Sequence, residues 1–320
     1  MQQSPLSARP VKTTMFASFL PQETQQLTEA TSIALAQAIT RTEIQTPLSP
    51  APIATAYTRS PDLSQSTPSL SVATSQPQPP ILLLHGFDSS LLEFRRLMPQ
   101  LAPHRETWAM DLLGFGFSNR AADLPFTPEA IKTHLYAFWK TCIGRPMTLV
   151  GASMGGAAAI DFCLTYPETV AQLVLLDAAG FAKGPAISRF LFPPLGYWAT
   201  EFLRQPKVRA QVSRKAYRDQ RFVTADAELC AALHLKLPRW SEALIDFTRS
   251  GGYNFLSDRI AHITQPTLIV WGRQDGILGT RDAERFQAAI AGSQLIWIED
   301  CGHVPHLEQP QTTANTILQF

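Results

Sequence analysis

The chain has 320 residues, a formal net charge of +1, and 45% apolar residues. This length accommodates one large α/β domain with an inserted subdomain, and the composition is that of a globular protein. Because the charges are balanced and no run of Lys or Arg occurs, nothing in the sequence indicates a nucleic-acid partner.

The cysteines and the apolar stretches narrow the class further. None of the four cysteines belongs to a C-x-x-C pair, which suggests neither a zinc site nor a redox motif and fits a reducing compartment. No apolar stretch reaches the length of about 18 residues that marks a membrane span, and the start of the chain lacks the apolar core of a secretory signal. We therefore expect a cytoplasmic protein.

Residues 1–79 differ in composition from the rest of the chain, being rich in Gln, Ser, Thr and Pro and poor in charge. Few helix breakers occur in residues 23–44, which predicts a helix, and residues 53–59 are predicted as a first strand. Residues 60–80 carry several Pro and Ser, which is typical of a loop or a flexible linker. We interpret residues 1–79 as a low-complexity N-terminal extension.

From residue 80 onward, short apolar runs alternate with stretches that are compatible with helices. Each run is apolar on both faces and ends near Gly, Asp or His, which is the pattern of strands buried in a parallel sheet. The expected strands are 81–84, 107–110, 147–150, 173–176, 267–271 and 294–298, and the expected helices include 128–141, 155–166 and 281–290. This alternation predicts an α/β fold, with a mostly parallel sheet flanked by helices, over residues 80–320.

The interval between residues 176 and 267 contains no convincing strand. Its helical stretches include 198–207 and 225–236. An insertion of this length in an α/β domain is usually a cap over a binding site. We therefore predict a helical cap at about 181–255, before the strand 267–271 and the acidic residue that follows it. The cap opens with apolar side chains, namely Phe181, Phe190, Leu191, Phe192, Leu195, Tyr197, Trp198, Phe202 and Leu203. The pattern does not distinguish a pocket for a large apolar substrate from the cap's own core.

The strongest motif is Gly151-Ala152-Ser153-Met154-Gly155, which lies between an apolar strand and a helix rich in small residues. A nucleophilic serine at such a turn adopts a strained backbone conformation. The flanking glycines let strand and helix approach without a clash of Cβ atoms. The motif predicts Ser153 as the nucleophile of an α/β-hydrolase fold.

A serine hydroxyl needs a general base, and the base needs an orienting acid; in this fold the chain order is Ser, acid, His. His303 follows the last apolar strand, where the base should emerge, whereas His306 is expected to be structural and His262 precedes a strand at the wrong end of the sheet. Asp275 and Asp177 both follow strands, so both are candidates for the acid. We favour Asp275, whose position is the commoner one in this architecture.

Two backbone N–H groups should stabilise the oxyanion of the tetrahedral intermediate. One belongs to Met154, the residue after the nucleophile, and the other is expected from Phe87 in the turn after strand 81–84. His85 in the same turn is then a packing and turn-shaping residue. This chemistry needs no metal and no organic cofactor.

From about residue 80 to the end, the sequence resembles the serine-type α/β-hydrolase superfamily. More narrowly, it resembles the chlorophyll dephytylases, which remove the phytyl chain from chlorophyll. The similar segments are HGFDSSLLEFRRL (85–97), ETWAMDLLGFGFS (106–118), FWK (138–140), AAAIDF (157–162), SGGYN (250–254) and CGHVPHLEQP (301–310). The resemblance implies that Ser153, Asp275 and His303 form the catalytic triad. It is weaker at residues 152–154, where the plant members carry Pro and Leu around the serine, and in the early cap.

The resemblance implies a hydrolase for a hydrophobic ester, the phytyl ester of chlorophyll, with peripheral contact to a pigment-bearing thylakoid membrane. The alternatives are a general carboxylesterase or lipase, a carbon–carbon bond hydrolase, an acyltransferase, and a ligand sensor on the same scaffold.

Overall fold

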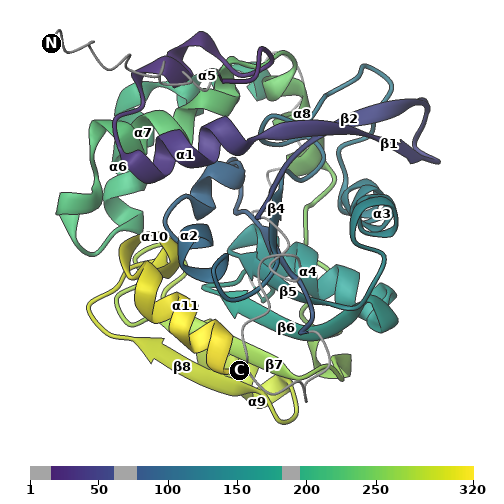
Figure 1. The fold of residues 1–320 in the computed structure, drawn as a ribbon, viewed down its shortest axis with the longest axis vertical. Helices are drawn as coiled ribbons and strands as arrows, with labels where there is room; N and C mark the ends of the chain where they lie inside the picture. The colour runs from purple at the N-terminus through teal and green to yellow at the C-terminus, as the bar shows by residue number, and fades with distance from the viewer. Residues whose placement is uncertain (1–15, 61–77, 182–194) are drawn as a thin grey trace, which may run out of the picture.

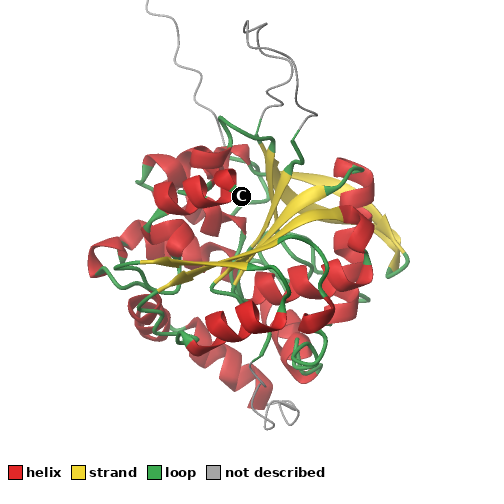
Figure 2. Ribbon diagram, turned by 90° about the horizontal axis from the view of Figure 1, so that it is seen from below, coloured by secondary structure: helices red, strands yellow, loops and turns green. Residues whose placement is uncertain are grey.

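The computed structural model describes residues 16–60, 78–181 and 195–320. Its centre is an eight-stranded sheet in the order β1-β2-β4-β3-β5-β6-β7-β8. Strand β2 pairs antiparallel with β1 and with β4, and all other pairs are parallel. Helices cover both faces of the sheet (Figure 2). The predicted α/β class and the mostly parallel sheet are confirmed.

The strands from residue 80 onward lie where the sequence predicts them, and some run slightly longer. The full set is β1 Thr40–Thr46, β2 Ser49–Arg59, β3 Ile81–Leu84, β4 Thr107–Met110, β5 Met147–Ala152, β6 Val170–Leu176, β7 Thr267–Gly272 and β8 Gln294–Ile298. Strands β3, β4, β5 and β7 are buried along their whole length. Strand β8 is the exception to the expected burial on both faces, because it forms the edge of the sheet and exposes alternate residues.

Alternate residues of the central strands feed two separate apolar cores. In β3, Leu82 and Leu84 join one core, whereas Ile81 and Leu83 join the other. The first core is covered by α3 (Pro128–Phe138), α4 (Met154–Thr165) and α9 (Arg281–Ala289), and the second by α1 (Ala30–Ala38), α2 (Met98–Leu101) and α11 (Pro310–Gln319). This two-sided burial explains why the strands have no polar face.

The N-terminal region differs from its prediction. The helix expected at residues 23–44 is replaced by a short 3-10 turn at Gln22–Gln26, the helix α1, and the strand β1, and the strand expected at 53–59 is the second half of β2. Residues Thr40, Thr42, Ile44 and Thr46 are β-branched and alternate with polar residues, a pattern that favours a strand over a helix. Because β2 pairs with β4, the sheet extends across the boundary drawn at residue 79.

The cap lies between β6 and β7. It consists of α5 (Leu195–Arg204), α6 (Pro206–Ala216), α7 (Ala225–Ala232), a 3-10 turn at Leu233–Lys236, and α8 (Trp240–Arg249), and its described residues form no strand. Figure 1 shows these helices gathered at the top of the view, next to α1. Residues Phe190, Leu191 and Phe192 lie outside the described residues. No helix in the described ranges has the length and hydropathy needed to cross a membrane.

Candidate active site

The turn between β5 and α4 holds Ser153 in a strained backbone conformation with a positive φ, at φ 50° and ψ −117°. The flanking glycines are required by their surroundings: a Cβ on Gly151 would lie 2.3 Å from the carbonyl oxygen of Gly155, and one on Gly155 would lie 2.2 Å from that of Leu84. Such local strain persists only where the surrounding structure enforces it. The turn therefore has the geometry of a nucleophile elbow.

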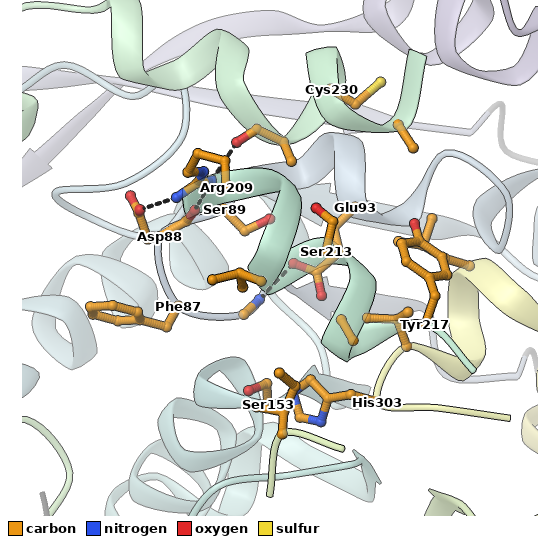
Figure 3. Close-up of a pocket in the computed structure, with 18 of the residues that line it drawn as sticks. Phe87, Asp88, Ser89, Glu93, Ser153, Arg209, Ser213, Tyr217, Cys230 and His303 are labelled. Carbon is orange, nitrogen blue, oxygen red and sulfur yellow. Dashed lines mark hydrogen bonds and ion pairs between the residues drawn. The ribbon is translucent and has the colours of Figure 1, made fainter. Parts of the chain in front are cut away.

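His303 follows β8 and lies beside Ser153 in the wall of one cavity (Figure 3). Its Nδ1 atom is 2.8 Å from Oδ2 of Asp275, which follows β7. The other carboxylate oxygen, Oδ1, accepts hydrogen bonds from the N–H groups of Ile277 (2.7 Å) and Leu278 (3.0 Å). This pairing assigns the proton to Nδ1 and leaves Nε2 as the basic nitrogen.

The charge state of Asp275 suits an orienting acid. Burial raises the pKa of this carboxyl, but the hydrogen bond from His303 and the two backbone N–H groups outweigh burial, and the net pKa lies below its usual value. Asp275 is therefore ionised at neutral pH and accepts the hydrogen bond from Nδ1 of His303.

Asp177, the alternative acid, follows β6 and is fully buried. One of its oxygens accepts a hydrogen bond from the N–H of Gly272 at 3.0 Å. One carboxyl oxygen of Asp177 comes within 4.8 Å of a carboxylate oxygen of Asp275 and a ring nitrogen of His303, yet the imidazole N–H donates its hydrogen bond to Asp275. Burial, and then the charge of Asp275, raise the pKa of Asp177 well above its usual value. Burial and the neighbouring carboxylate thus favour the protonated form of Asp177, next to the Asp275–His303 pair.

The loop after β3 passes over the nucleophile, since a Cβ on Gly86 would lie 3.4 Å from the Cβ of Ser153. The N–H of Gly86 donates to Oε2 of Glu93 at 2.9 Å and is therefore occupied. Within the described residues, the N–H of Phe87 has no acceptor, and Met154 is the first residue of α4, where N–H groups lack an intrahelical partner. These two N–H groups, the pair expected from the sequence, are available to an oxyanion.

His85 is held in one tautomer by two contacts in the core. Its Nδ1 is 2.8 Å from the carbonyl oxygen of Gly86, and its Nε2 accepts the N–H of Leu112 at 3.1 Å. Burial lowers the pKa of His85 to about 4, so the ring is neutral. These contacts fit the packing and turn-shaping role expected of His85.

The two other histidines considered as candidates, His262 and His306, do not line the cavity that contains Ser153. His306 is buried, with Nε2 2.9 Å from Oε1 of Glu93, in agreement with a structural role. His262 is exposed near the carbonyl of Arg259.

Asp88 connects the loop after β3 to the cap, a role that the sequence did not suggest. Its Oδ1 accepts hydrogen bonds from Nε1 of Trp240 (2.7 Å) and Nε2 of His234 (3.1 Å), and its Oδ2 forms an ion pair with Arg209 of α6. Asp88 has φ 49° and directly follows Phe87. The carboxylate therefore fixes one oxyanion donor relative to three separate cap elements.

A second set of contacts connects the cap to the loop that carries the base. The N–H of His303 donates to the carbonyl oxygen of Ala216 at the end of α6, at 2.7 Å. The carboxylate of Glu308 accepts the N–H groups of Gly302 (2.9 Å), Arg218 (3.1 Å) and Asp219 (2.6 Å). The end of α6 and the base loop are thus joined through the backbone.

Ser153 and His303 line a cavity of about 320 Å³, at the lower end of the range of about 300–1,000 Å³ for ligand pockets. Its wall is formed mainly by apolar and small residues of the cap and of the loops after β3, β7 and β8; they include Phe87, Leu203, Val212, Ala216, Tyr217, Ala227, Ala231, Ile277, Val304 and Leu307. Among the described members of the apolar cluster at the start of the cap, only Leu203 lines this cavity. Phe181 packs on Phe286 instead, with ring centroids 4.7 Å apart, and Leu195, Trp198 and Phe202 are exposed.

The parallel sheet, the serine elbow, and the hydrogen-bonded His–Asp pair define a serine hydrolase scaffold of the α/β type. The sequence matches the profile of the alpha/beta hydrolase family over residues 81–316, and the chain belongs to this family. The predicted superfamily is thereby confirmed.

The similar proteins include several kinds of hydrolase. The chain is 35% identical over 307 residues to the alpha/beta hydrolase domain-containing protein VTE7 of Arabidopsis thaliana, covering 95% of this chain and 90% of that protein. It is 28% identical over 253 residues to the 2-hydroxy-6-oxo-6-(2'-aminophenyl)hexa-2,4-dienoic acid hydrolase of Metapseudomonas resinovorans (75% and 83% coverage), and 26% identical over 264 residues to the human (Homo sapiens) monoacylglycerol lipase ABHD6 (76% and 75%).

Among solved structures, a thermophilic esterase from Thermogutta terrifontis superimposes with a TM-score of 0.69 at 23% identity, over 87% of this chain and 97% of that one. At this identity the likeness supports the fold alone.

Proposed function

We propose that this protein hydrolyses a lipophilic carboxylic ester through Ser153, His303 and Asp275. The Oγ of Ser153 attacks the ester carbonyl carbon while Nε2 of His303 takes the hydroxyl proton. The N–H groups of Phe87 and Met154 stabilise the oxyanion, and the alcohol leaves with the proton from His303. Water then attacks the acyl-enzyme by the same route and releases the acid.

The observation that carries this proposal is the 2.8 Å contact between Nδ1 of His303 and Asp275, next to a serine at a strained elbow. A ligand sensor would not require an oriented base. An active-site fluorophosphonate should label the wild type and not Ser153→Ala. Absence of labelling near neutral pH would overturn the assignment of Ser153 and support a sensor.

Within this reaction class, we propose the phytyl ester of chlorophyll as the substrate. Support comes from the segments HGFDSS (85–90) and SGGYN (250–254), which the general fold does not demand, and from the mainly apolar cavity. Phe87 and Ile277 line the cavity and are also exposed by 45% and 39%, so they can contact the part of a large substrate that lies outside.

The test is incubation of the wild type and Ser153→Ala with chlorophyll a in mild detergent, and with p-nitrophenyl esters of graded chain length. Release of chlorophyllide and phytol by the wild type alone would support dephytylation. Cleavage of the nitrophenyl esters alone would retain ester hydrolysis and refute the pigment substrate. Transfer of the acyl group to an added alcohol, with little free acid, would identify an acyltransferase instead.

We also propose that the cap contacts the surface of a pigment-bearing membrane. Leu195, Trp198 and Phe202 share one face of α5, and Trp198 is 68% exposed. Helix α6 adds basic side chains and has no acidic residue. Such a combination suits an anionic lipid surface. The double variant Trp198→Glu, Phe202→Glu should lose sedimentation with anionic vesicles, whereas Ile296→Glu, on the edge strand β8, should keep it; equal binding would refute this surface.

A further inference from the structure

Arg95 is a buried cation in the wall of the catalytic cavity. The residue is 2% exposed and lines the same cavity as Ser153. Its Nη1 makes one long hydrogen bond to the carbonyl oxygen of Leu92, at 3.4 Å. The nearest carboxylate oxygen belongs to Glu29, 4.0 Å from Nε, and Glu29 makes its closer bonds, at 2.7 and 2.8 Å, to Arg96.

The guanidinium therefore has unused hydrogen-bonding capacity. Among the described residues, Nε and Nη2 of Arg95 have no hydrogen-bond partner. A buried charge without hydrogen bonds lowers the stability of the fold. Replacing such a charge by an apolar side chain often leaves the stability unchanged or raises it. The neighbours Phe94 and Leu97 are core residues, so an apolar residue at position 95 would suit the local packing. The charge indicates a ligand rather than a requirement of the fold.

Tyr217 adds a second polar group to the same part of the cavity. It is 7% exposed and lines the same cavity as Arg95, whose positive charge acts on the Tyr217 hydroxyl. Burial raises the pKa of Tyr217 above its usual value even beside the guanidinium, so the hydroxyl keeps its proton. When the phenolic oxygen accepts from Arg95, its O–H remains free to donate.

The charge around this position determines which ligand it can accept. Glu93 faces the same cavity, and although burial opposes ionisation, its contacts with His306 lower its pKa to about 2. Both of its oxygens are occupied, by Gly86 and by His306. Figure 3 shows Glu93 and Tyr217 on the side of the cavity away from Ser153 and His303. An anionic ligand group would be repelled by this ionised carboxylate, whereas a carbonyl oxygen accepts hydrogen bonds without adding charge.

We propose that Arg95 and Tyr217 form a subsite that binds a second, uncharged carbonyl oxygen on the acyl part of the substrate. The inference rests on the proposed ester hydrolysis and specifies the substrate class as esters of acids that carry an additional ketone or ester group. We assign the second carbonyl to the acyl part of the substrate rather than to its alcohol part. The reason is that Glu93, next to this subsite, accepts a hydrogen bond from Gly86, in the loop that binds the acyl carbonyl. The acid portion of chlorophyll carries such a ketone, and smaller oxo acids do as well.

The test compares p-nitrophenyl esters of straight-chain oxo acids, with the ketone at graded positions, against plain alkanoates of equal chain length. The wild type should hydrolyse at least one oxo ester with a kcat/KM about 10- to 100-fold above its alkanoate, the range of one hydrogen bond to a charged group. Arg95→Met should bring this ratio close to one, and Arg95→Lys should retain part of the preference.

Three outcomes would overturn the subsite. In the first, Arg95→Met slows oxo ester and alkanoate equally and unfolds at lower urea, which would make Arg95 structural. In the second, the wild type shows no oxo preference at any position. In the third, esters with a terminal carboxylate are preferred to the oxo esters, which would contradict an uncharged ligand.

Binding separates the subsite from the proposed reaction. In the Ser153→Ala background, calorimetric affinity for the same oxo ester should fall about 10- to 100-fold on adding Arg95→Met. Equal affinities would refute the subsite whether or not the wild type turns the ester over. Loss of turnover with a retained affinity difference would refute the proposed function alone.

Discussion

Replacing Asp88 by alanine should destabilise the protein by about 3 kcal/mol, because it leaves two buried donors and a partly buried cation without their shared acceptor. Removing one partner of a buried ion pair costs about 3–5 kcal/mol. The lower end applies here, since the Arg209 side chain is 19% exposed and keeps a 2.6 Å hydrogen bond to the carbonyl of Ala231. Asp88→Asn, which tolerates the left-handed backbone and keeps one acceptor, should lose less.

The assay is urea unfolding followed by circular dichroism, together with kcat for a p-nitrophenyl ester. Since Asp88 directly follows Phe87, its loss should also displace an oxyanion donor and lower kcat by up to about 100-fold. Asp123→Ala, at an exposed carboxylate that bonds Ser49, serves as the control and should change stability by less than about 0.5 kcal/mol. A loss below about 1 kcal/mol with normal kcat in Asp88→Ala would refute the anchoring role.

Three further predictions concern the acid, one glycine, and pH. Asp275→Asn should lower kcat about 10,000-fold, whereas Asp177→Asn should change it by less than about tenfold, because the imidazole of His303 donates to Asp275. If steady-state assays show the larger loss for Asp177→Asn, Asp177 is the orienting acid instead. Gly272→Ala should lower the free energy of unfolding by about 1–3 kcal/mol, since its Cβ would lie 1.8 Å from the carbonyl oxygen of Gly302; an unchanged urea midpoint would contradict this close approach. Burial lowers the pKa of His134 from 6.5 to about 4. The free energy of unfolding is therefore highest above pH 6.5, where His134 is neutral in both states, and it should fall by roughly 3 kcal/mol as the pH falls towards 4. In urea titrations at several pH values, His134→Gln should reduce this dependence of stability on pH.

The sequence predicts those parts of the molecule whose structure is determined by residues close together in the chain. Strands β3, β4, β5 and β7 are short, mainly apolar runs because they are buried on both faces, and such runs are visible without knowledge of their neighbours. Ser153, Asp275 and His303 could be placed because each occupies a loop directly after a predicted strand. Strand β1 was missed because only Ile44 among its alternating residues is strongly apolar.

Contacts made by docking of the cap could not be predicted. Asp88 meets its three partners at separations of 121 to 152 residues, and nothing in the loop sequence indicates them. Arg95 was likewise not singled out, because its burial depends on how the cap closes the cavity. The aromatic residues of α5 show the same limit, since the sequence did not reveal that Trp198 and Phe202 face outward.

The backbone bond between His303 and the end of α6 limits how this enzyme can admit a substrate. If α6 swung outward as a rigid lid, it would break the bond from His303 to Ala216 and pull on the contacts of Glu308 with Arg218 and Asp219. Such an open form would have a misplaced base and would be inactive until it closed. The position of α6 and the position of the base are therefore coupled, so a movement of α6 would also change the reactivity of His303.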